Sequence, residues 1–125
     1  MFKKSLPVLL LSLLLAGCAS QLTNLTPQLR HRNPNNQYLV EVSFNTRQET
    51  VRWQSIRPQI VVGSEVYSMR PTLLMTNRWE GLVPVPRGTS QVRYHYKFDF
   101  QFNQMGKPGS DTALSPEYTL RILEQ

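Results

Sequence analysis

The fold is decided by the stretch VRYHYKFDFQF, residues 92–102. Apolar side chains occupy every second position of this stretch, and charged or polar side chains lie between them. Because successive side chains of a β-strand point to opposite faces of the sheet, the alternation predicts a long strand with one buried and one wet face. The chain is therefore expected to fold around a sheet that is covered on one side.

Shorter runs of the same kind lie on both sides of this strand. Residues 38–44 alternate in the same way, and residues 118–122 form a last alternating strand. Gly63 and Ser64 separate two apolar runs, which is typical of a tight hairpin, because glycine supplies the positive φ of the first turn position. Pro58 lies in a further apolar region and restricts it to a sheet edge or a bend.

The part of the chain that follows residue 36 shows no convincing helical spacing. About six or seven short strands are expected in residues 37–125, joined by Gly- and Pro-containing turns such as residues 86–89. A polar loop, residues 104–115, precedes the last strand. This organisation predicts an all-β fold, a small antiparallel immunoglobulin-like β-sandwich.

Residues 1–17 have the organisation of a secretory signal peptide. Two lysines precede an apolar run, residues 6–16, that is too short to span a bilayer as a stable helix. The sequence LAGC at residues 15–18 resembles the lipobox of bacterial lipoprotein precursors. The resemblance implies that the signal peptide is removed and that Cys18 is acylated and becomes the first mature residue.

An acylated Cys18 would anchor the protein to membrane lipid without spanning the membrane. One acyl chain binds a membrane only reversibly, whereas two or three hold a protein firmly, since each buried CH₂ contributes about 0.8 kcal/mol. Ala19 and Ser20 follow, and the absence of an aspartate after the cysteine resembles the sorting signal for the outer membrane of Gram-negative bacteria. The expected location is the cell envelope, at the outer membrane.

Residues 18–36 are expected to form the lipidated end and a flexible tether. They are rich in Gln, Asn, Thr and Pro, lack periodicity and end in NPNN. A flexible coil of this length spans about 25 Å and would hold the domain off the lipid surface. Arg30, His31 and Arg32 are candidates for contacts with phosphate head groups, at about 1 kcal/mol for each basic side chain.

Composition limits the kinds of function. Without the signal peptide the chain has 108 residues, enough for one domain, and Cys18 is its only cysteine, so no disulfide forms within it. Loss of the two leader lysines lowers the net charge from +6 to +4. An arginine-rich surface of this sign suits anionic lipid, lipopolysaccharide or acidic glycan, or is simply solvated. The compartment argues against nucleic acid as a partner.

The sequence offers little for catalysis or metal binding. His95 belongs to the wet face of the long strand, where a solvated side chain is expected, and Glu80 has no companion carboxylate for cleavage of a glycosidic bond. Two distant histidines and a lipidated cysteine do not form a metal site. The protein is therefore expected to be no enzyme and to need no cofactor.

The middle of the chain, residues 60–122, resembles carbohydrate-binding modules of the starch- and glycogen-binding kind. The resemblance rests on pieces that occur in the same order: IVVGS at 60–64, MTNRWE at 75–80, VPVPRGT at 83–89, YKF at 96–98 and YTL at 118–120. It implies an immunoglobulin-like sandwich and a sugar-contacting lysine at Lys97. After the Gly-Ser turn the family usually has a tryptophan, where this chain has only Tyr67, and the family's second binding tryptophan has no counterpart.

The two tryptophans bear on two functional hypotheses. Trp79 is expected in the core, whereas for Trp53 core and surface positions are equally open. The first hypothesis is a lipid-anchored, non-catalytic binding or structural module that contacts another envelope protein or a cell-surface polysaccharide. The alternative is a glycan-binding protein with Trp53, Tyr67 and Lys97 as its contacts.

Overall fold

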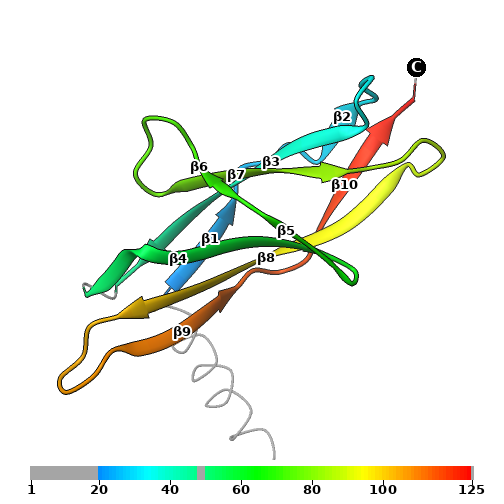
Figure 1. The fold of residues 1–125 in the computed structure, drawn as a ribbon. Helices are drawn as coiled ribbons and strands as arrows, with labels where there is room; N and C mark the ends of the chain where they lie inside the picture. Colours follow the sequence, from blue (N-terminus) through cyan, green and yellow to red (C-terminus); the bar gives the residue numbers. More distant parts are fainter. Residues whose placement is uncertain (1–19, 48–49, 125) are drawn as a thin grey trace, which may run out of the picture.

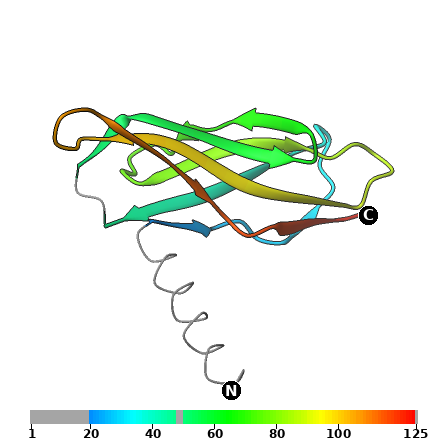
Figure 2. The same cartoon turned by 90° about the horizontal axis from the view of Figure 1, so that it is seen from below.

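The computed structural model describes residues 20–47 and 50–124, which form two β-sheets packed face to face (Figure 1). All regular elements in these residues are strands, ten in number. The strands run along the length of an elongated molecule (Figure 2). The predicted all-β sandwich is confirmed.

The first sheet has four antiparallel strands in the order β1-β3-β7-β6. The central strands are β3 (Gln37–Thr46) and β7 (Arg78–Pro84). The edges are formed by β1 (Ser20–Asn24) and by the short β6 (Arg70–Pro71).

The second sheet has the order β2-β10-β8-β4-β5, with β9 beside the second half of β8. Among the described strands only β2 and β10 pair in parallel. The strands are β2 (Leu29–His31), β4 (Val51–Val62), β5 (Glu65–Ser68), β8 (Gln91–Phe102), β9 (Gly109–Leu114) and β10 (Tyr118–Leu123). β8 has β4 on one side and β9 and β10 on the other, so it is the centre of this sheet.

The core lies between the facing sides of β8 and β3. The even-numbered side chains from Tyr94 to Phe100 on β8 and from Tyr38 to Phe44 on β3 are all buried. The period-two pattern of the long strand therefore reports its buried face correctly, and Trp79 lies in the core as predicted. The turns expected at residues 63–64 and 86–89 also form, with positive φ angles of 59° and 94° at their glycines.

The strand order is that of an immunoglobulin-type sandwich. The first sheet corresponds to strands A-B-E-D, and in the second β10, β8 and β4 correspond to G-F-C. Antibody domains join strands B and F by a disulfide. Here the rings of Phe44 on β3 and Phe98 on β8 lie 5.5 Å apart and join the same two strands. An aromatic contact thus occupies the place of the disulfide.

The prediction of a flexible tether up to residue 36 is wrong for most of that segment. β1 pairs with β3, and β2 pairs with β10, so both belong to the sandwich. These two strands are held mainly by backbone pairing and contribute one side chain, Leu22, to the core, which explains why no periodic pattern marks them. The predicted signal peptide and Cys18 lie outside the described residues.

A buried polar network fixes the place where the chain crosses from the first sheet to the second. The Thr26 hydroxyl accepts the backbone N–H of Glu41 at 2.8 Å. The Tyr96 hydroxyl donates to Asn24 Oδ1 at 2.6 Å, and Asn24 Nδ2 donates to the Tyr94 hydroxyl at 3.1 Å. These bonds hold the segment between β1 and β2 on the core, so the folded domain begins with β1 rather than with β3.

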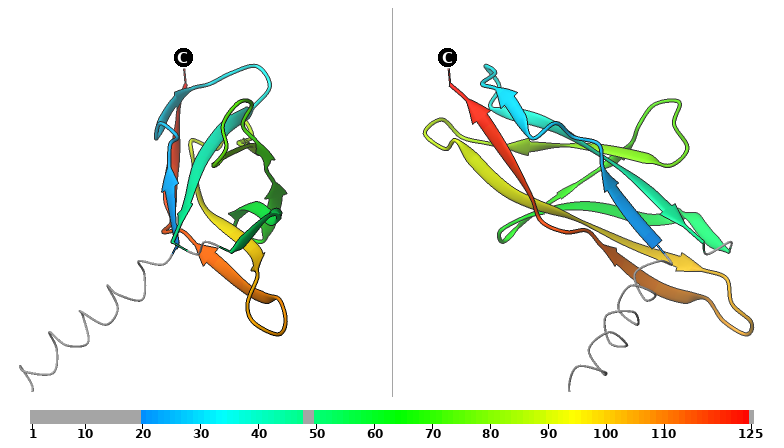
Figure 3. Two further views of the ribbon diagram at one scale, coloured as in Figure 1. Left: turned by 90° about the vertical axis from the view of Figure 1, so that its left-hand side faces the viewer. Right: turned by 180° about the vertical axis from the view of Figure 1, so that it is seen from behind.

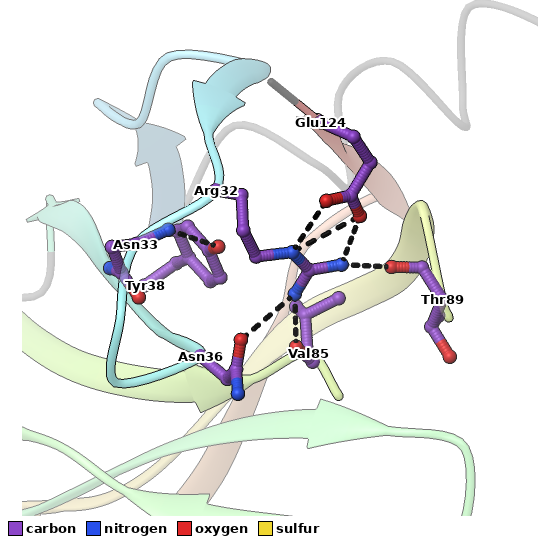
Figure 4. Close-up of polar contacts among 7 residues, drawn as sticks. All are labelled: Arg32, Asn33, Asn36, Tyr38, Val85, Thr89 and Glu124. Atoms are coloured by element: carbon purple, nitrogen blue, oxygen red, sulfur yellow. Dashed lines mark hydrogen bonds and ion pairs between the residues drawn. The ribbon is translucent and has the colours of Figure 1, made fainter. Parts of the chain in front are cut away.

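Arg32 ties β2 to two other parts of the chain (Figure 4). Its guanidinium donates to two carbonyl oxygens of the β7–β8 connection at 2.6 and 2.8 Å and pairs with Glu124 at 2.6 Å. Arg30 donates to the Leu39 carbonyl at 3.0 Å. Both guanidinium groups therefore make hydrogen bonds within the fold, and their contacts with phosphate head groups stay a prediction.

β9 lies in the segment that was expected to be a polar loop. Residues 109–114 pair with the second half of β8 in a long hairpin. Most of their side chains are exposed, so backbone hydrogen bonds rather than burial keep them in the sheet. Pro58 lies next to an irregularity in β4, in agreement with the predicted bend.

Candidate functional site

A wide bulge in β4 shapes the candidate site. β4 pairs with β8 on both sides of the bulge, but its residues 53–56 face the single residue Phe100. Ser55 holds the bulge, because its hydroxyl donates to the Arg52 carbonyl at 2.6 Å and accepts a backbone N–H of β8 at 2.8 Å. Trp53 is the first of the extra residues and lies at the rim of the sandwich.

Trp53 ends a row of aromatic rings that connects the two sheets. Its side chain is 46% exposed, yet its ring lies parallel to that of Trp79, with the centroids 6.2 Å apart. Phe44 contacts both indoles edge-on, and Phe98 packs at right angles to Trp79 at 5.3 Å. The buried rings therefore support one side of Trp53 while part of its indole remains exposed to solvent.

A groove of about 600 Å³ lies beside Trp53. Two aromatic and four polar residues line it: Phe44, Asn45, Thr46, Trp53, Thr76 and Asn77. The asparagines contact each other, with Asn77 Nδ2 donating to Asn45 Oδ1 at 3.2 Å. An exposed indole beside amide and hydroxyl groups suits a ligand with an apolar face and a polar edge, such as a sugar ring.

The structure does not bring the three predicted glycan contacts together. Tyr67 pairs with the fully buried Ile60, so its half-buried side chain lies on the inner face of the second sheet. Lys97 pairs with Gln59 and lies on the outer face of the same sheet. Trp53 follows Arg52, which pairs with Gln101, whereas Ile60 pairs with Tyr96, so Trp53 and Ile60 are about 13–17 Å apart along the sheet. One sugar ring therefore cannot contact all three.

A second hollow, of about 580 Å³, lies on the outer face of the second sheet beside the bulge. Its charged residues are Arg57, Asp99 and Asp111. Asp99 accepts a hydrogen bond of 2.6 Å from the exposed hydroxyl of Thr112. Asp111 is exposed and Asp99 is half-buried and hydrogen-bonded, so this hollow has the character of an ordinary polar surface.

No group of three or more His, Cys, Asp or Glu side chains in residues 20–47 and 50–124 is arranged to hold a metal ion. Nor does this described part contain a helix long and apolar enough to cross a membrane.

The fold and the groove define the class of protein: a small β-sandwich with immunoglobulin strand order and an aromatic groove at one end. No protein-family model matches the chain, and no curated protein matches it.

Sequence reasoning missed the polar half of the groove. Asn45 and Thr46 end β3, whereas Thr76 and Asn77 precede β7. The two segments meet because the Phe44 N–H donates to the Asn77 carbonyl at 3.0 Å. No local pattern connects residues so far apart in the chain. The available signal was Trp53, a large aromatic residue between the polar residues Arg52 and Gln54.

Proposed function

We propose that the protein is a lipid-anchored lipoprotein of the bacterial cell envelope, whose β-sandwich is a non-catalytic binding module. The observation that carries the proposal is the sequence LAGC at residues 15–18, directly after a basic and apolar leader. Acylated Cys18 attaches the protein to lipid, and the residues after it favour the outer membrane. The sandwich is then available to another envelope protein or a polysaccharide.

Cys18→Ser tests the anchor. In cells grown with labelled palmitate, the wild type is expected to carry the label and to sediment with the outer-membrane fraction. The variant should carry no label and stay in the soluble fraction. Ala19→Asp is the matched control, because it keeps the cysteine and the label but should move the protein to the inner membrane. A wild type that carries no label overturns the proposal.

The groove beside Trp53 favours a second candidate function, the binding of a glycan. The observation behind it is an exposed indole supported by Trp79 and flanked by Asn45 and Asn77. The resemblance of residues 60–122 to starch- and glycogen-binding modules points to the same ligand class. The site proposed here differs from the one that the resemblance implies, because Lys97 lies outside the groove.

Electrophoresis in native gels that contain glycogen or another glucan tests this second candidate. The wild type should be retarded, and Trp53→Ala should abolish the retardation because it removes the stacking surface, with its fold checked by circular dichroism. Lys97→Ala is the matched control and should remain retarded. Loss of retardation in Lys97→Ala alone would place the ligand at the site implied by the resemblance. A wild type that no polysaccharide retards excludes glycan binding.

A further inference from the structure

Several connections and the start of β1 lie at the same end of the sandwich (Figure 3). Ser20 opens β1 and pairs with Thr46, the last residue of β3. The β3–β4, β6–β7 and β8–β9 connections leave their strands at this end. We call it the β1 end; it comprises Ser20 and the described residues of segments 47–50, 72–77 and 103–108.

The β1 end exposes apolar side chains at the tips of its loops. Leu73 is 84% exposed and Leu74 95% exposed in the β6–β7 connection, and Met105 is fully exposed in the β8–β9 connection. The connections at the opposite end are residues 32–36, 63–64 and 85–90, and none of their side chains is an exposed large hydrophobic. Of the connections at the two ends, only those where the chain enters the domain thus expose large apolar side chains; the β1–β2 connection exposes one more, Leu25, at 37%.

The backbone of the β6–β7 connection is strained at Leu74. This residue has a φ of 65°, in the left-handed region that a side chain with a Cβ rarely adopts. The conformation turns an apolar side chain into solvent and brings it no burial within the fold. Strain combined with an exposed apolar tip indicates a surface that contacts something outside the chain.

The proposed anchor lies immediately beside this end. Cys18 precedes Ser20 by two positions, and two residues span at most about 7 Å. The flexible tether expected from the sequence would have allowed about 25 Å. Because β1 begins so early, an acylated Cys18 keeps the β1 end at the lipid surface.

We infer that the β1 end is a membrane-contacting surface, with Leu73, Leu74 and Met105 inserted among the lipid head groups. The inference rests on the proposed lipid anchor. Interfacial contacts of this kind combine shallow burial of apolar side chains with attraction of basic ones to anionic lipid. Arg47 and Lys107 provide that charge on two of the same connections, which contain one carboxylate, Glu49.

The test uses the full lipidated protein, reconstituted into vesicles of phosphatidylethanolamine and phosphatidylglycerol. Because Cys18 is the only cysteine and is acylated, a cysteine introduced elsewhere can be labelled selectively with an environment-sensitive fluorophore. Leu74→Cys and Met105→Cys report on the β1 end. Arg87→Cys is the matched control, since this side chain is exposed at the opposite end.

Emission from positions 74 and 105 is expected to shift to the blue on reconstitution and to be quenched by brominated lipids. Emission from position 87 should show neither change. No shift at 74 and 105, or the same response at all three positions, overturns the membrane contact even when palmitate labelling shows that the anchor is present. Absence of the palmitate label overturns the anchor and this inference together, so the two failures are distinguishable.

Discussion

Leu74 combines a backbone conformation that lowers stability with an exposed apolar side chain. A left-handed backbone costs a residue with a Cβ about 1–2 kcal/mol, and asparagine tolerates it better. Leu74→Asn is therefore expected to raise the free energy of unfolding by about 1 kcal/mol. Urea unfolding of the Cys18→Ser protein measures the change. Leu73→Asn is the control and should stay within about 0.5 kcal/mol of the parent; a lower unfolding midpoint for Leu74→Asn contradicts the prediction.

Tyr96 makes stability sensitive to alkaline pH. Burial raises the pKa of its phenol above the ordinary value of about 10, so the folded state keeps the proton that the unfolded state loses. Its contribution is complete below pH ~10 and is lost as the pH rises further. Tyr96→Phe should cost about 1–3 kcal/mol at neutral pH, because Asn24 Oδ1 loses the shorter of its two hydrogen bonds, and should weaken the alkaline loss. Denaturant titrations at several pH values, with Tyr67→Phe as control, measure both effects.

The two tryptophans show what sequence could establish at the scale of single residues. Trp79 precedes a strong hairpin pattern, and its burial was predictable. Trp53 lies in a bulge whose geometry depends on the Ser55 hydroxyl and on the backbone of β8. Its half-exposed position is set by a long-range register shift, which no local pattern of side chains encodes.

At the scale of elements, Gly81 allows β7 to pack against β4. A Cβ at this position would lie 2.8 Å from Ile60 Cδ1 and 3.2 Å from the Ser68 carbonyl oxygen. Gly81→Ala is expected to lower the free energy of unfolding by about 1–3 kcal/mol through overpacking. Ile60→Val removes the nearest atom and should restore part of the loss in the double variant. Urea unfolding of the four proteins forms a cycle, and simple additivity of the two changes would contradict this contact.

Strands were predictable where one face is buried. The alternating patterns of β3, β8 and β10 follow directly from the core that they share. Few side chains are buried in β1, β2 and β9. These strands are held by backbone hydrogen bonds to the edges of β3, β10 and β8, respectively. Their composition resembles that of loops, and this is why residues 18–36 and 104–115 were interpreted as irregular.

At the scale of the whole molecule, the ion pair of Arg32 with Glu124 joins the residues that follow β2 and β10 at one end of the sandwich. Acid is expected to weaken this contact. The hydrogen bond and charge of Arg32 hold the pKa of the Glu124 carboxyl below its ordinary value. The resulting stability is complete above about pH 4.3 and is lost as the pH falls through the lower pKa of the folded state. Glu124→Gln should lower the urea midpoint at neutral pH and flatten its decline in acid. Glu65→Gln, an exposed carboxylate at the same end, should retain the decline.

The overall architecture was accessible from the sequence, and the groove was not. Alternation, turn glycines and the lack of helical spacing were sufficient for an all-β sandwich. The groove depends on three segments that meet only after both sheets have formed: the end of β3, the bulge of β4 and the connection before β7.

The parallel pairing of β2 with β10 determines when the second sheet can be completed. β2 is among the first strands to be synthesised and β10 is the last described strand, so this sheet cannot close before β10 has been made. A chain still emerging from the ribosome lacks the strand that β2 requires. If the chain is exported as we propose, this late closure keeps it open enough to pass through a narrow secretion channel.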